Sequence, residues 1–470
     1  MRTRRKAIFN TVLILLVVFT ISHLYRAKRD FASLARRGLQ HHQVQFRESL
    51  WHLFTKHEPR CAALELSESA GWPRYDALFE TARDNHIDHG EEIVAPMQNA
   101  HDGVVHEIRK TGLHPPYVLG TRGVVSAAGG KYLPTFVVTL RLLRRTGCTM
   151  PVELFVKDTL EYDPGVCETV LPALNARCVV LDAARSIEHY QLKSFAVLFS
   201  SFEDVVWLDA DCIPLYDPET LLLAEPYVST GLVTWPDYWA STISPFYFTI
   251  SRQAEVPTTA RASTEAGVFL VSKKTHAHSL VLAAYYNYYG PSHYYHLLAQ
   301  GAPGEGDKDT FVQAAAAVHQ PFYTVSERVA DLGRRRFADN DWDIIHVAMV
   351  QADPVQDYEL TRQGKRRVED ELVADAPRAF FVHANMVKFN PGDSLLDASQ
   401  NDDDDGRRRL WTAPEESMRR LGYDVEQRAW EEVITVSCLL GGVFGTEHCG
   451  RVQMHWTAVF GNWTAMQSQS

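Results

Sequence analysis

The segment Val205–Leu215, VVWLDADCIPL, places four apolar residues directly before two carboxylates that are separated by one alanine. An uninterrupted apolar run of this kind is typical of a strand that is buried on both faces of a sheet. Side chains two residues apart in an extended backbone point to the same side, so Asp209 and Asp211 can face one ligand. Two unpaired carboxylates at the end of a buried strand are costly, and Mn²⁺ or Mg²⁺ is the natural counter-ion. The plain alternative is a strand-end turn in which both aspartates bond to nearby amides.

Strand-like and helix-like segments alternate upstream of this run. The expected strands are 122–126, 152–156, 178–181 and 205–208, and the expected helices are 133–145, 166–174 and 191–202. This alternation predicts an α/β fold with a mostly parallel central sheet that helices cover on both faces. Ligands of such sheets bind at the carboxyl ends of the strands, where Asp209 and Asp211 are expected to lie.

Composition sets broad limits on the class of protein. The chain has 470 residues, 46% of them hydrophobic, which is enough for a sizeable core. Its formal net charge of -11 argues against a dedicated nucleic-acid binder.

The N-terminus combines a basic tail with an apolar segment. Residues 1–6 include four basic residues, and residues 7–25 are apolar over the length that a membrane-spanning helix needs. No short apolar core with a small-residue cleavage site is apparent, so we expect an uncleaved signal anchor with a cytosolic tail. Residues 26–115, polar and mixed in charge, are expected to form a lumenal stem before the main domain at residues 116–470.

The cysteines fit an oxidising lumen, because all seven follow the apolar segment. Proximity along the chain favours the pairs Cys167–Cys178 and Cys438–Cys449, and the odd number leaves at least one cysteine unpaired. Asn462, in Asn-Trp-Thr, is an acceptor for N-glycosylation if the C-terminus is lumenal.

Two chemistries use a metal held by carboxylates at a strand end. One is the departure of a diphosphate during transfer from a nucleotide sugar, and the other is phosphoryl transfer with the first aspartate as nucleophile. For the second, Asp307 and Asp309 could pass for the later acidic motif of haloacid-dehalogenase-type phosphatases. Placement argues against it, because that chemistry uses the first strand of its domain. Here three strand-like segments come earlier, and Pro214 follows where a helix-opening loop is needed.

Beyond the aspartate pair, a series of motifs follows in the order YQLKSFAVLFSSFEDVVWLDADCIPLYDP (190–218), TWPDYW (234–239), STEAGVFLVSKKTH (263–276), YYNYYGP (285–291), LLAQGAPGEGDKDTF (297–311), AMVQADP (348–354) and FVHANMVKFNP (381–391). With these motifs the sequence resembles the fungal Golgi α-mannosyltransferases, single-span type II proteins that elongate or branch mannan with GDP-mannose. The motifs cover about residues 120–395. The YYNYYGP and GAPGEGDKDTF motifs resemble the α-1,2-branching members more than the α-1,3 members.

The resemblance implies a GT-A-like nucleotide-diphospho-sugar transferase fold in residues 116–470. It also implies retaining transfer of mannose from GDP-mannose, with Mn²⁺ or Mg²⁺ as cofactor, to mannan or to the oligomannose outer chains of N-glycans. The expected location is the Golgi membrane with the catalytic domain in the lumen, and a Golgi mannosyltransferase complex is a candidate partner. An α-1,3-mannosyltransferase and a relative that binds mannan without turnover are the alternatives within this fold.

The resemblance also assigns roles around the aspartates. Asp209 would contact the nucleotide ribose or the metal, Asp211 would bind the metal, and His383 would complete the metal coordination. Lys388, five residues further on, would neutralise the diphosphate. Without the family, a histidine between apolar residues is more often a satisfied core residue than a ligand.

Two further groups are candidates for holding the donor. Gly129, Gly130 and Lys131 lie between a strand and a helix, where a helix N-terminus can hold phosphates, although a plain turn fits equally. Lys193 lies on the helix before the aspartates and would hold Asp209 or the donor, unless it is a solvated lysine.

The remaining candidates would contact sugars. Asp307, Asp309 and Glu265 are the other candidate catalytic carboxylates, although one aspartate of the pair could merely cap the apolar helix that follows. Covalent attack by Asp307 and a front-face displacement both stay open. The candidate substrate contacts are Trp235, Asp237, Trp239 and Asn385, and the first three combine aromatic faces with a carboxylate.

Overall fold

The computed structural model describes residues 39, 41–181, 187–338, 341–392, 408–441 and 446–461. The expected signal anchor at residues 7–25 and the sequon at Asn462 lie outside these residues. Among the described residues, no helix combines the length and the hydropathy that a membrane span requires.

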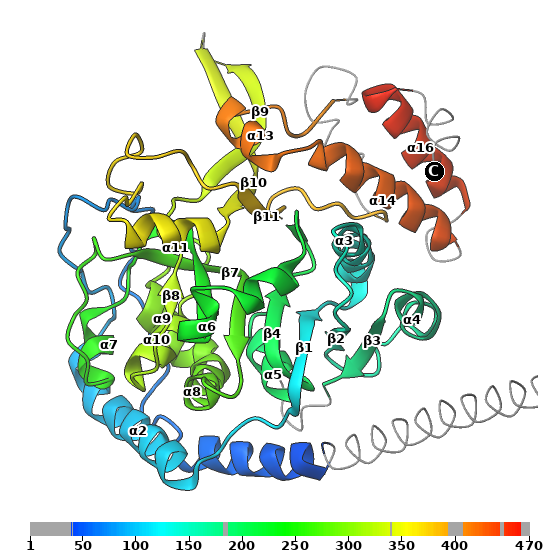
Figure 1. The fold of residues 1–470 in the computed structure, drawn as a ribbon. Coiled ribbons are helices and arrows are strands. Elements are labelled where there is room, and N and C mark those ends of the chain that lie inside the picture. Colours follow the sequence, from blue (N-terminus) through cyan, green and yellow to red (C-terminus); the bar gives the residue numbers. More distant parts are fainter. Residues whose placement is uncertain are drawn as a thin grey trace, which may run out of the picture.

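A seven-stranded sheet lies at the centre of the molecule (Figure 1). Its strands, in spatial order, are β3 (Ala176–Val180), β2 (Val152–Val156), β1 (Val118–Ala127), β4 (Phe202–Leu208), β7 (Ala262–Ser272), β6 (Leu232–Ala240) and β8 (Tyr323–Thr324). Strand β7 is antiparallel to both neighbours, and the other paired strands are parallel. The carboxyl ends of β1, β4, β6 and β8 therefore share one edge, where ligands of open α/β sheets bind.

A second, antiparallel sheet begins directly after the aspartate pair. Its strands, in spatial order, are β5 (Cys212–Pro214), β11 (Ala379–His383), β10 (Asp341–Ala352) and β9 (Ala330–Ala338). His383 pairs with Cys212, which brings a histidine from late in the chain next to Asp211. Strands β9 and β10 form a hairpin that projects from the body at the top of Figure 1.

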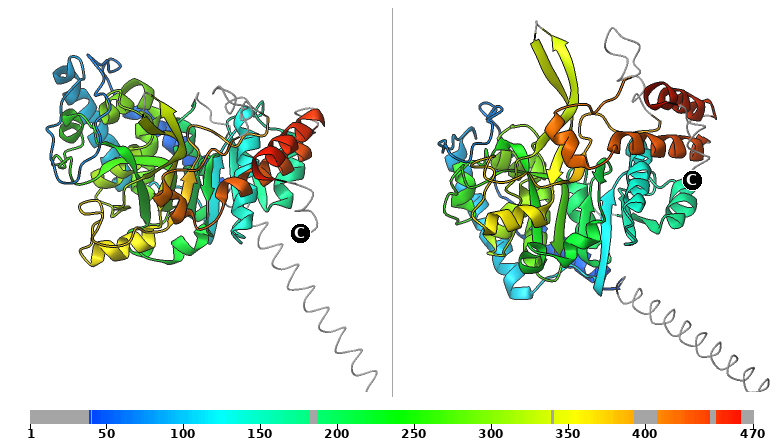
Figure 2. Two further views of the ribbon diagram at one scale, coloured as in Figure 1. Left: turned by 90° about the horizontal axis from the view of Figure 1, so that it is seen from above. Right: turned by 45° about the horizontal axis from the view of Figure 1, so that its top comes forward.

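Helices surround the two sheets. Their bounds are α2 (Gly90–Thr111), α3 (Leu133–Arg145), α4 (Leu171–Ala173), α5 (Gln191–Phe199), α6 (Tyr227–Thr230), α7 (Pro245–Ile250), α8 (Ala277–Tyr288), α9 (Tyr295–Ala299), α10 (Thr310–Ala317), α11 (Pro354–Arg362), α13 (Glu415–Leu421), α14 (Val425–Leu439) and α16 (Thr446–Phe460). Helix α14 packs along α3 (Figure 2). There Arg145 pairs with both Glu431 and Glu432.

The apolar run before the aspartates is buried on both faces, as predicted. Val206 and Leu208 belong to the core that contains α3 and α14, whereas Val205 and Trp207 belong to the core that contains α5 and α8. Successive side chains of a strand point to opposite faces, so an alternating pattern would have left one face exposed to solvent. The expected α/β architecture is thus confirmed.

The expected elements before the aspartates are confirmed with changes at their ends. The helix at 133–145 and the strand at 152–156 have the expected bounds. The helix expected at 191–202 ends at Phe199, because Ser200 is extended (φ -60°, ψ 158°) and Phe202 already begins β4. The helix expected at 166–174 is a π-helical turn, Gly165–Val170, followed by α4.

The expected stem needs correction over its inner part. Residues 41–56 form a helix that packs, together with α2, into the same core as α5 and α8. The hydroxyl of Tyr285 donates to the carbonyl of His57 at 2.6 Å, and the hydroxyl of Tyr289 donates to that of Phe54 at 2.9 Å. The apolar faces of these helices complete the core of the main domain, so residue 115 does not separate two packing units.

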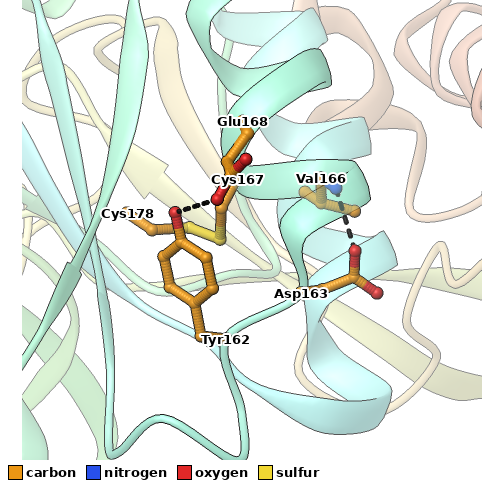
Figure 3. The surroundings of a disulfide bond; sticks show 6 residues. All are labelled: Tyr162, Asp163, Val166, Cys167, Glu168 and Cys178. Atoms are coloured by element: carbon orange, nitrogen blue, oxygen red, sulfur yellow. Dashed lines mark hydrogen bonds between the residues drawn. A yellow bond between two sulfur atoms is a disulfide. The ribbon is translucent and has the colours of Figure 1, made fainter.

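Both cysteine pairs that proximity favoured are formed. The Cys167–Cys178 disulfide joins the helical segment after β2 to β3 (Figure 3), and Cys438–Cys449 joins α14 to α16. Cys61, Cys148 and Cys212 are free thiols. Disulfides persist in oxidising compartments, so these two pairs fit the expected lumenal environment.

The start of α14 holds a buried carboxyl group. Glu426 is 1% exposed and accepts hydrogen bonds from the backbone N–H groups of Leu410 (2.7 Å) and Trp411 (3.0 Å). Burial raises the pKa of Glu426 from 4.5 to about 7. Because the folded state holds this proton more tightly than the unfolded chain, stability is highest below pH 4.5 for this group and is lost as the pH rises towards 7.

We expect the free energy of unfolding of Glu426→Gln to depend less on pH than that of the parent, since the amide carries no charge to bury. The difference between parent and variant should reach on the order of 3 kcal/mol across this pH range. Urea unfolding at about pH 4.5 and about pH 7 measures it, with Glu415→Gln as the control because that side chain is 80% exposed. An identical pH dependence in parent and Glu426→Gln would contradict the prediction.

Candidate metal and donor site

Asp209 and Asp211 lie at the carboxyl edge of the sheet, as predicted. One carboxylate oxygen of each lies within 4.8 Å of the other and of a ring nitrogen of His383. Asp211 is 6% exposed and His383 9%, whereas Asp209 is partly open to solvent. Two carboxylates and an imidazole, with one accessible side, fit a divalent cation such as Mn²⁺ or Mg²⁺.

The backbone of the aspartate loop is held from three elements. The N–H of Asp209 donates to the carbonyl of Gly267 in β7 at 2.8 Å, and the N–H of Ala384 donates to the carbonyl of Asp211 at 3.0 Å. The hydroxyl of Thr139 in α3 donates to the carbonyl of Ala210 at 2.6 Å. The two carboxylates are therefore presented by a fixed loop, which a pre-organised site requires.

His383 connects two acidic side chains. Its Nε2 lies 3.2 Å from Asp211 Oδ1, and its Nδ1 lies 3.1 Å from Glu265 Oε1. Burial alone would lower the pKa of His383, but Glu265 and Asp211 outweigh it and raise the pKa well above its ordinary value. A carboxylate on the second ring nitrogen is what orients a metal-ligating histidine in known sites. Glu265 is thus placed to orient His383.

Lys388 lies on the other side of Asp211. Its ammonium contacts Asp211 Oδ2 and lies 5.8 Å above the ring of Tyr132. Burial alone would raise the pKa of Asp211, but His383 and Lys388 outweigh it and hold that pKa well below its usual range. Asp211 is therefore ionised and available to a cation across the physiological pH range.

The glycine turn after β1 lies next to Lys388. Residues Gly130–Tyr132 form a 3-10 turn, and the side chain of Asn390 donates to the carbonyl of Lys131 at 2.7 Å. Gly130 has φ +52°, which favours glycine, and a Cβ at Gly129 would lie 2.2 Å from Glu161 Oε2. The structure thus brings this turn to the aspartates, and both glycines are needed for its shape.

Lys193 is a buried bridge between two carboxylates. Its Nζ lies 3.2 Å from Asp209 Oδ1 and 3.1 Å from Asp307 Oδ2, and it donates to the carbonyl of Ala266 at 2.5 Å. Burial alone would lower the pKa of Lys193, but Asp209 and Asp307 raise it above its ordinary value. Burial raises the pKa of Asp307 to about 6. The alternative of a solvated lysine is wrong.

Comparison with known proteins identifies the family. The family model described as "Mannosyltransferase putative" matches residues 121–262 and 256–353. The chain is also 32% identical, over 414 residues, to the α-1,2-mannosyltransferase MNN21 of Candida albicans. The chain belongs to this mannosyltransferase family. The matched residues include Lys193, Asp209, Asp211 and Asp307.

The chain covers less than two thirds of the length of the mannosyltransferase relatives described here. The match to MNN21 covers 74% of this chain and 62% of the relative. The α-1,2-mannosyltransferase MNN2 of Saccharomyces cerevisiae is 33% identical over 308 residues, which cover 56% of this chain and 51% of the relative. Among solved structures, the glycosyltransferase GlyE of Streptococcus pneumoniae matches 70% of this chain and 64% of its own at 12% identity, with a TM-score of 0.35. That score is too low to support an inference.

Two residues predicted for the candidate site have structural roles instead. Trp235 is 0% exposed, its indole N–H donates to the carbonyl of Ala352 at 2.8 Å, and its ring packs edge-on against Phe381 between the two sheets. No face of this ring is free for a sugar. Asp309 Oδ1 accepts from both the N–H and the hydroxyl of Thr264 at 3.1 Å, so Asp309 anchors β7 to the start of α10.

The other candidate sugar contacts, Asp237, Trp239 and Asn385, have different surroundings. Asp237 pairs with Lys308 at 2.8 Å, and the partly exposed Trp239 packs edge-on against Trp72. Within the described part of the chain, Asn385 Oδ1 and Glu265 Oε2 are buried without a hydrogen-bond partner. Such atoms are rare in proteins and suit groups that meet a ligand.

Sequence reasoning missed two residues of this candidate site. A Cβ at Gly267 would lie 2.7 Å from the His383 ring and 3.0 Å from Glu265 Oε1, so only glycine leaves room for that pair. A glycine inside a strand pattern signals close approach of another group, and STEAGVF carries that signal. Trp207, which the sequence offers only as an apolar strand residue, donates its indole N–H to Asp209 Oδ1 at 2.8 Å.

Proposed function

We propose that this protein is a retaining α-mannosyltransferase that transfers mannose from GDP-mannose to an α-mannoside acceptor in α-1,2 linkage. The observation that carries the proposal is the cluster of Asp209, Asp211 and His383, with Lys388 on Asp211, at the carboxyl edge of the sheet. Membership of the mannosyltransferase family supports the sugar, and the names of the relatives favour α-1,2 over α-1,3 linkage.

Asp209, Asp211 and His383 would hold Mn²⁺ or Mg²⁺ as cofactor. When bound, such an ion neutralises the negative charge of a departing nucleoside diphosphate. The residues present fit this role, because carboxylate oxygens and an imidazole nitrogen are accepted ligands of Mn²⁺ and the partner of His383 is a carboxylate.

The protein's own residues would provide the rest of the catalysis. Lys388 places a fixed positive charge beside Asp211, where a phosphate oxygen of the donor can meet it, and such preorganised charge favours the transition state. Lys193 and Trp207 hold the carboxylate of Asp209. Asp307 reaches the same centre through Lys193 and is the candidate contact to the reacting mannose. Covalent attack by Asp307 and front-face displacement both remain compatible with this arrangement.

We place this activity in the Golgi lumen, on a type II membrane protein with one span at residues 7–25. The apolar N-terminal segment, the two disulfides and the sequon at Asn462 support that location. The acceptor would be mannan or the oligomannose outer chain of an N-glycan, and a Golgi mannosyltransferase complex would be the partner.

Two other functions are less well supported. A haloacid-dehalogenase-type phosphatase would need its aspartates after the first strand of the domain, whereas β4 is preceded along the chain by β1, β2 and β3. A lectin-like relative would bind mannan without any need for two cations and an imidazole around the aspartate pair.

The test is an assay of the purified full-length chain with labelled GDP-mannose, Mn²⁺ and a short α-mannoside. We expect a mannosylated product whose new linkage is α-1,2 by NMR. An α-1,3 product would move the protein to the α-1,3 alternative, binding without transfer would indicate the lectin, and phosphate release from a generic ester would indicate the phosphatase.

Gly267→Ala should weaken Mn²⁺ binding by at least about ten-fold, because the added methyl would displace the His383 ring from its place between Asp211 and Glu265. Gly267 does not have a positive φ, so alanine causes no backbone strain there. Overpacking at this position should also lower the free energy of unfolding by about 1–3 kcal/mol. Calorimetric titration with Mn²⁺ and urea unfolding measure the two effects.

The matched control is Gly450→Ala in α16, where an added Cβ would have no atom within 4 Å. It should leave Mn²⁺ affinity unchanged. Parental Mn²⁺ affinity in Gly267→Ala would show that His383 is not a ligand.

A further inference from the structure

A cavity of about 520 Å³ lies at the carboxyl ends of β6 and β8. Asp237 and Tyr238 of β6, Phe322 before β8 and the segment at residues 74–75 are among its walls. Strand β6 is parallel to β4, because both are antiparallel to β7 between them, so the cavity opens on the same edge of the sheet as Asp209. Asp237 also joins it to the catalytic centre, since Asp237 pairs with Lys308, the residue after Asp307.

The cavity is strongly basic. Four arginines are among its lining residues: Arg74, Arg261, Arg328 and Arg366. Two aspartates, Asp237 and Asp331, also line it, and Asp237 already pairs with Lys308 at 2.8 Å. The arginines therefore give the cavity a net positive charge.

Three of these arginines, among the described residues, are in no ion pair with a carboxylate. The guanidinium of Arg261 lies 5.4 Å from the ring centre of Phe322, and that of Arg74 lies 4.8 Å from that of Trp239. Arg328 donates to the carbonyl of Val368 at 3.0 Å. Only Arg366 pairs with a carboxylate, that of Glu369, among the ion pairs of the described residues. Arg261 is half-buried beside Phe322, and the nearby carboxylate of Asp309, which already accepts from Thr264, is not in an ion pair with it.

We propose that this cavity binds a phosphate ester carried by the acceptor glycan, so that phosphorylated mannosides are a preferred acceptor class. The inference rests on the proposed function. Guanidinium groups present paired N–H donors that match phosphate oxygens. The rings of Tyr75, Tyr238 and Phe322 also line the cavity, and aromatic rings of this kind can pack against a sugar.

The donor does not account for this charge. Lys388 and the aspartate cluster, on the β4 and β11 side of the edge, provide for the diphosphate of the donor. The arginines lie on the β6 and β8 side, next to Asp237 and Tyr238. An anion there belongs to a second molecule, and the acceptor is the molecule that must lie beside the donor sugar.

The binding test uses the full-length chain saturated with GDP and Mn²⁺, titrated calorimetrically with mannose 6-phosphate, mannose and inorganic phosphate. We expect mannose 6-phosphate to bind at least about ten-fold more tightly than either of the others. Arg261→Gln and the exposed Arg328→Gln should remove that preference. The control Arg252→Gln, whose side chain is 63% exposed and pairs with Asp102, should retain it.

The kinetic arm compares a neutral mannoside acceptor with its phosphorylated form. In Arg261→Gln the KM for the phosphorylated acceptor should rise at least about ten-fold, while kcat and the KM for the neutral acceptor stay within about two-fold of the parent. Arg328→Gln provides the same comparison at the surface if Arg261→Gln does not fold.

Each outcome decides the proposal. Equal affinity of the parent for mannose and mannose 6-phosphate overturns it, as does a preference that survives in both arginine variants. Inorganic phosphate binding as tightly as mannose 6-phosphate would indicate an adventitious ion only. Failure of the proposed function is separate, because it appears as absent transfer to every acceptor while the binding arm is unaffected.

Discussion

Asp211→Asn should lower kcat/KM for mannosyl transfer by at least about a thousand-fold while the domain stays folded. Asparagine preserves the volume of the side chain but removes the charge that His383 and Lys388 both contact. A neutral amide is a poor ligand for Mn²⁺, and it leaves Lys388 without the partner that holds it. The loss should appear in kcat at saturating donor as well as in KM, because a metal held there would act on the departing diphosphate.

The control for this variant is Asp370→Asn, an exposed aspartate in a surface turn where its carboxylate accepts from the N–H of Leu372. It should transfer mannose at the parental rate. Urea unfolding separates lost chemistry from lost structure, since Asp211→Asn should retain a cooperative transition. Transfer within about ten-fold of the parent by a folded Asp211→Asn protein would remove Asp211 from the mechanism.

Lys193→Met should have the largest effect on stability, a loss of about 3–5 kcal/mol. The ammonium of Lys193 is buried between Asp209 and Asp307, and methionine would leave these two carboxylates facing each other without a counter-charge. Transfer should fall as well, because Asp209 loses one of its two supports. Urea unfolding at pH 7 measures the loss of stability.

A second measurement separates this cause from a simple packing defect. Without Lys193 the pKa of Asp307, which burial already raises to about 6, should rise further. A raised carboxyl pKa favours the folded state at low pH, so Lys193→Met should regain stability as the pH falls from 7 to about 5. Adding Asp307→Asn should restore part of the loss at pH 7, and the exposed Lys365→Met should lose nothing. A loss that is independent of pH and unaffected by Asp307→Asn would contradict the charge argument.

The central sheet could be predicted from the sequence because its signals are local. The run Val205–Leu208 has no polar alternation, and it is buried on both faces. The small sheet could not be predicted, because β5 has three residues and its partner β11 lies more than 160 residues later along the chain. Its pairing is decided by tertiary contacts, so His383 could be placed beside Asp211 only through the family resemblance.

The candidate site likewise contains features that tertiary contacts decide and that the sequence alone does not predict. Asp307 and Asp309 look alike in GEGDKDTF, yet one contacts Lys193 in the centre and the other is fixed by Thr264. Sequence spacing does not distinguish them, because the difference depends on which side of the turn meets β7. The packing of the helix at residues 41–56 into the main core could not be predicted for a related reason, since an amphipathic helix does not reveal what its apolar face will cover.

The most direct test of the account is electron paramagnetic resonance of Mn²⁺ titrated into the full-length protein with GDP present, in the parent and in Asp211→Asn and His383→Gln. The account predicts that the parent binds one Mn²⁺ per chain and that both substitutions weaken this binding by at least about ten-fold. Undiminished binding of Mn²⁺ and GDP in both variants would contradict it, because the ion would then be held by other residues.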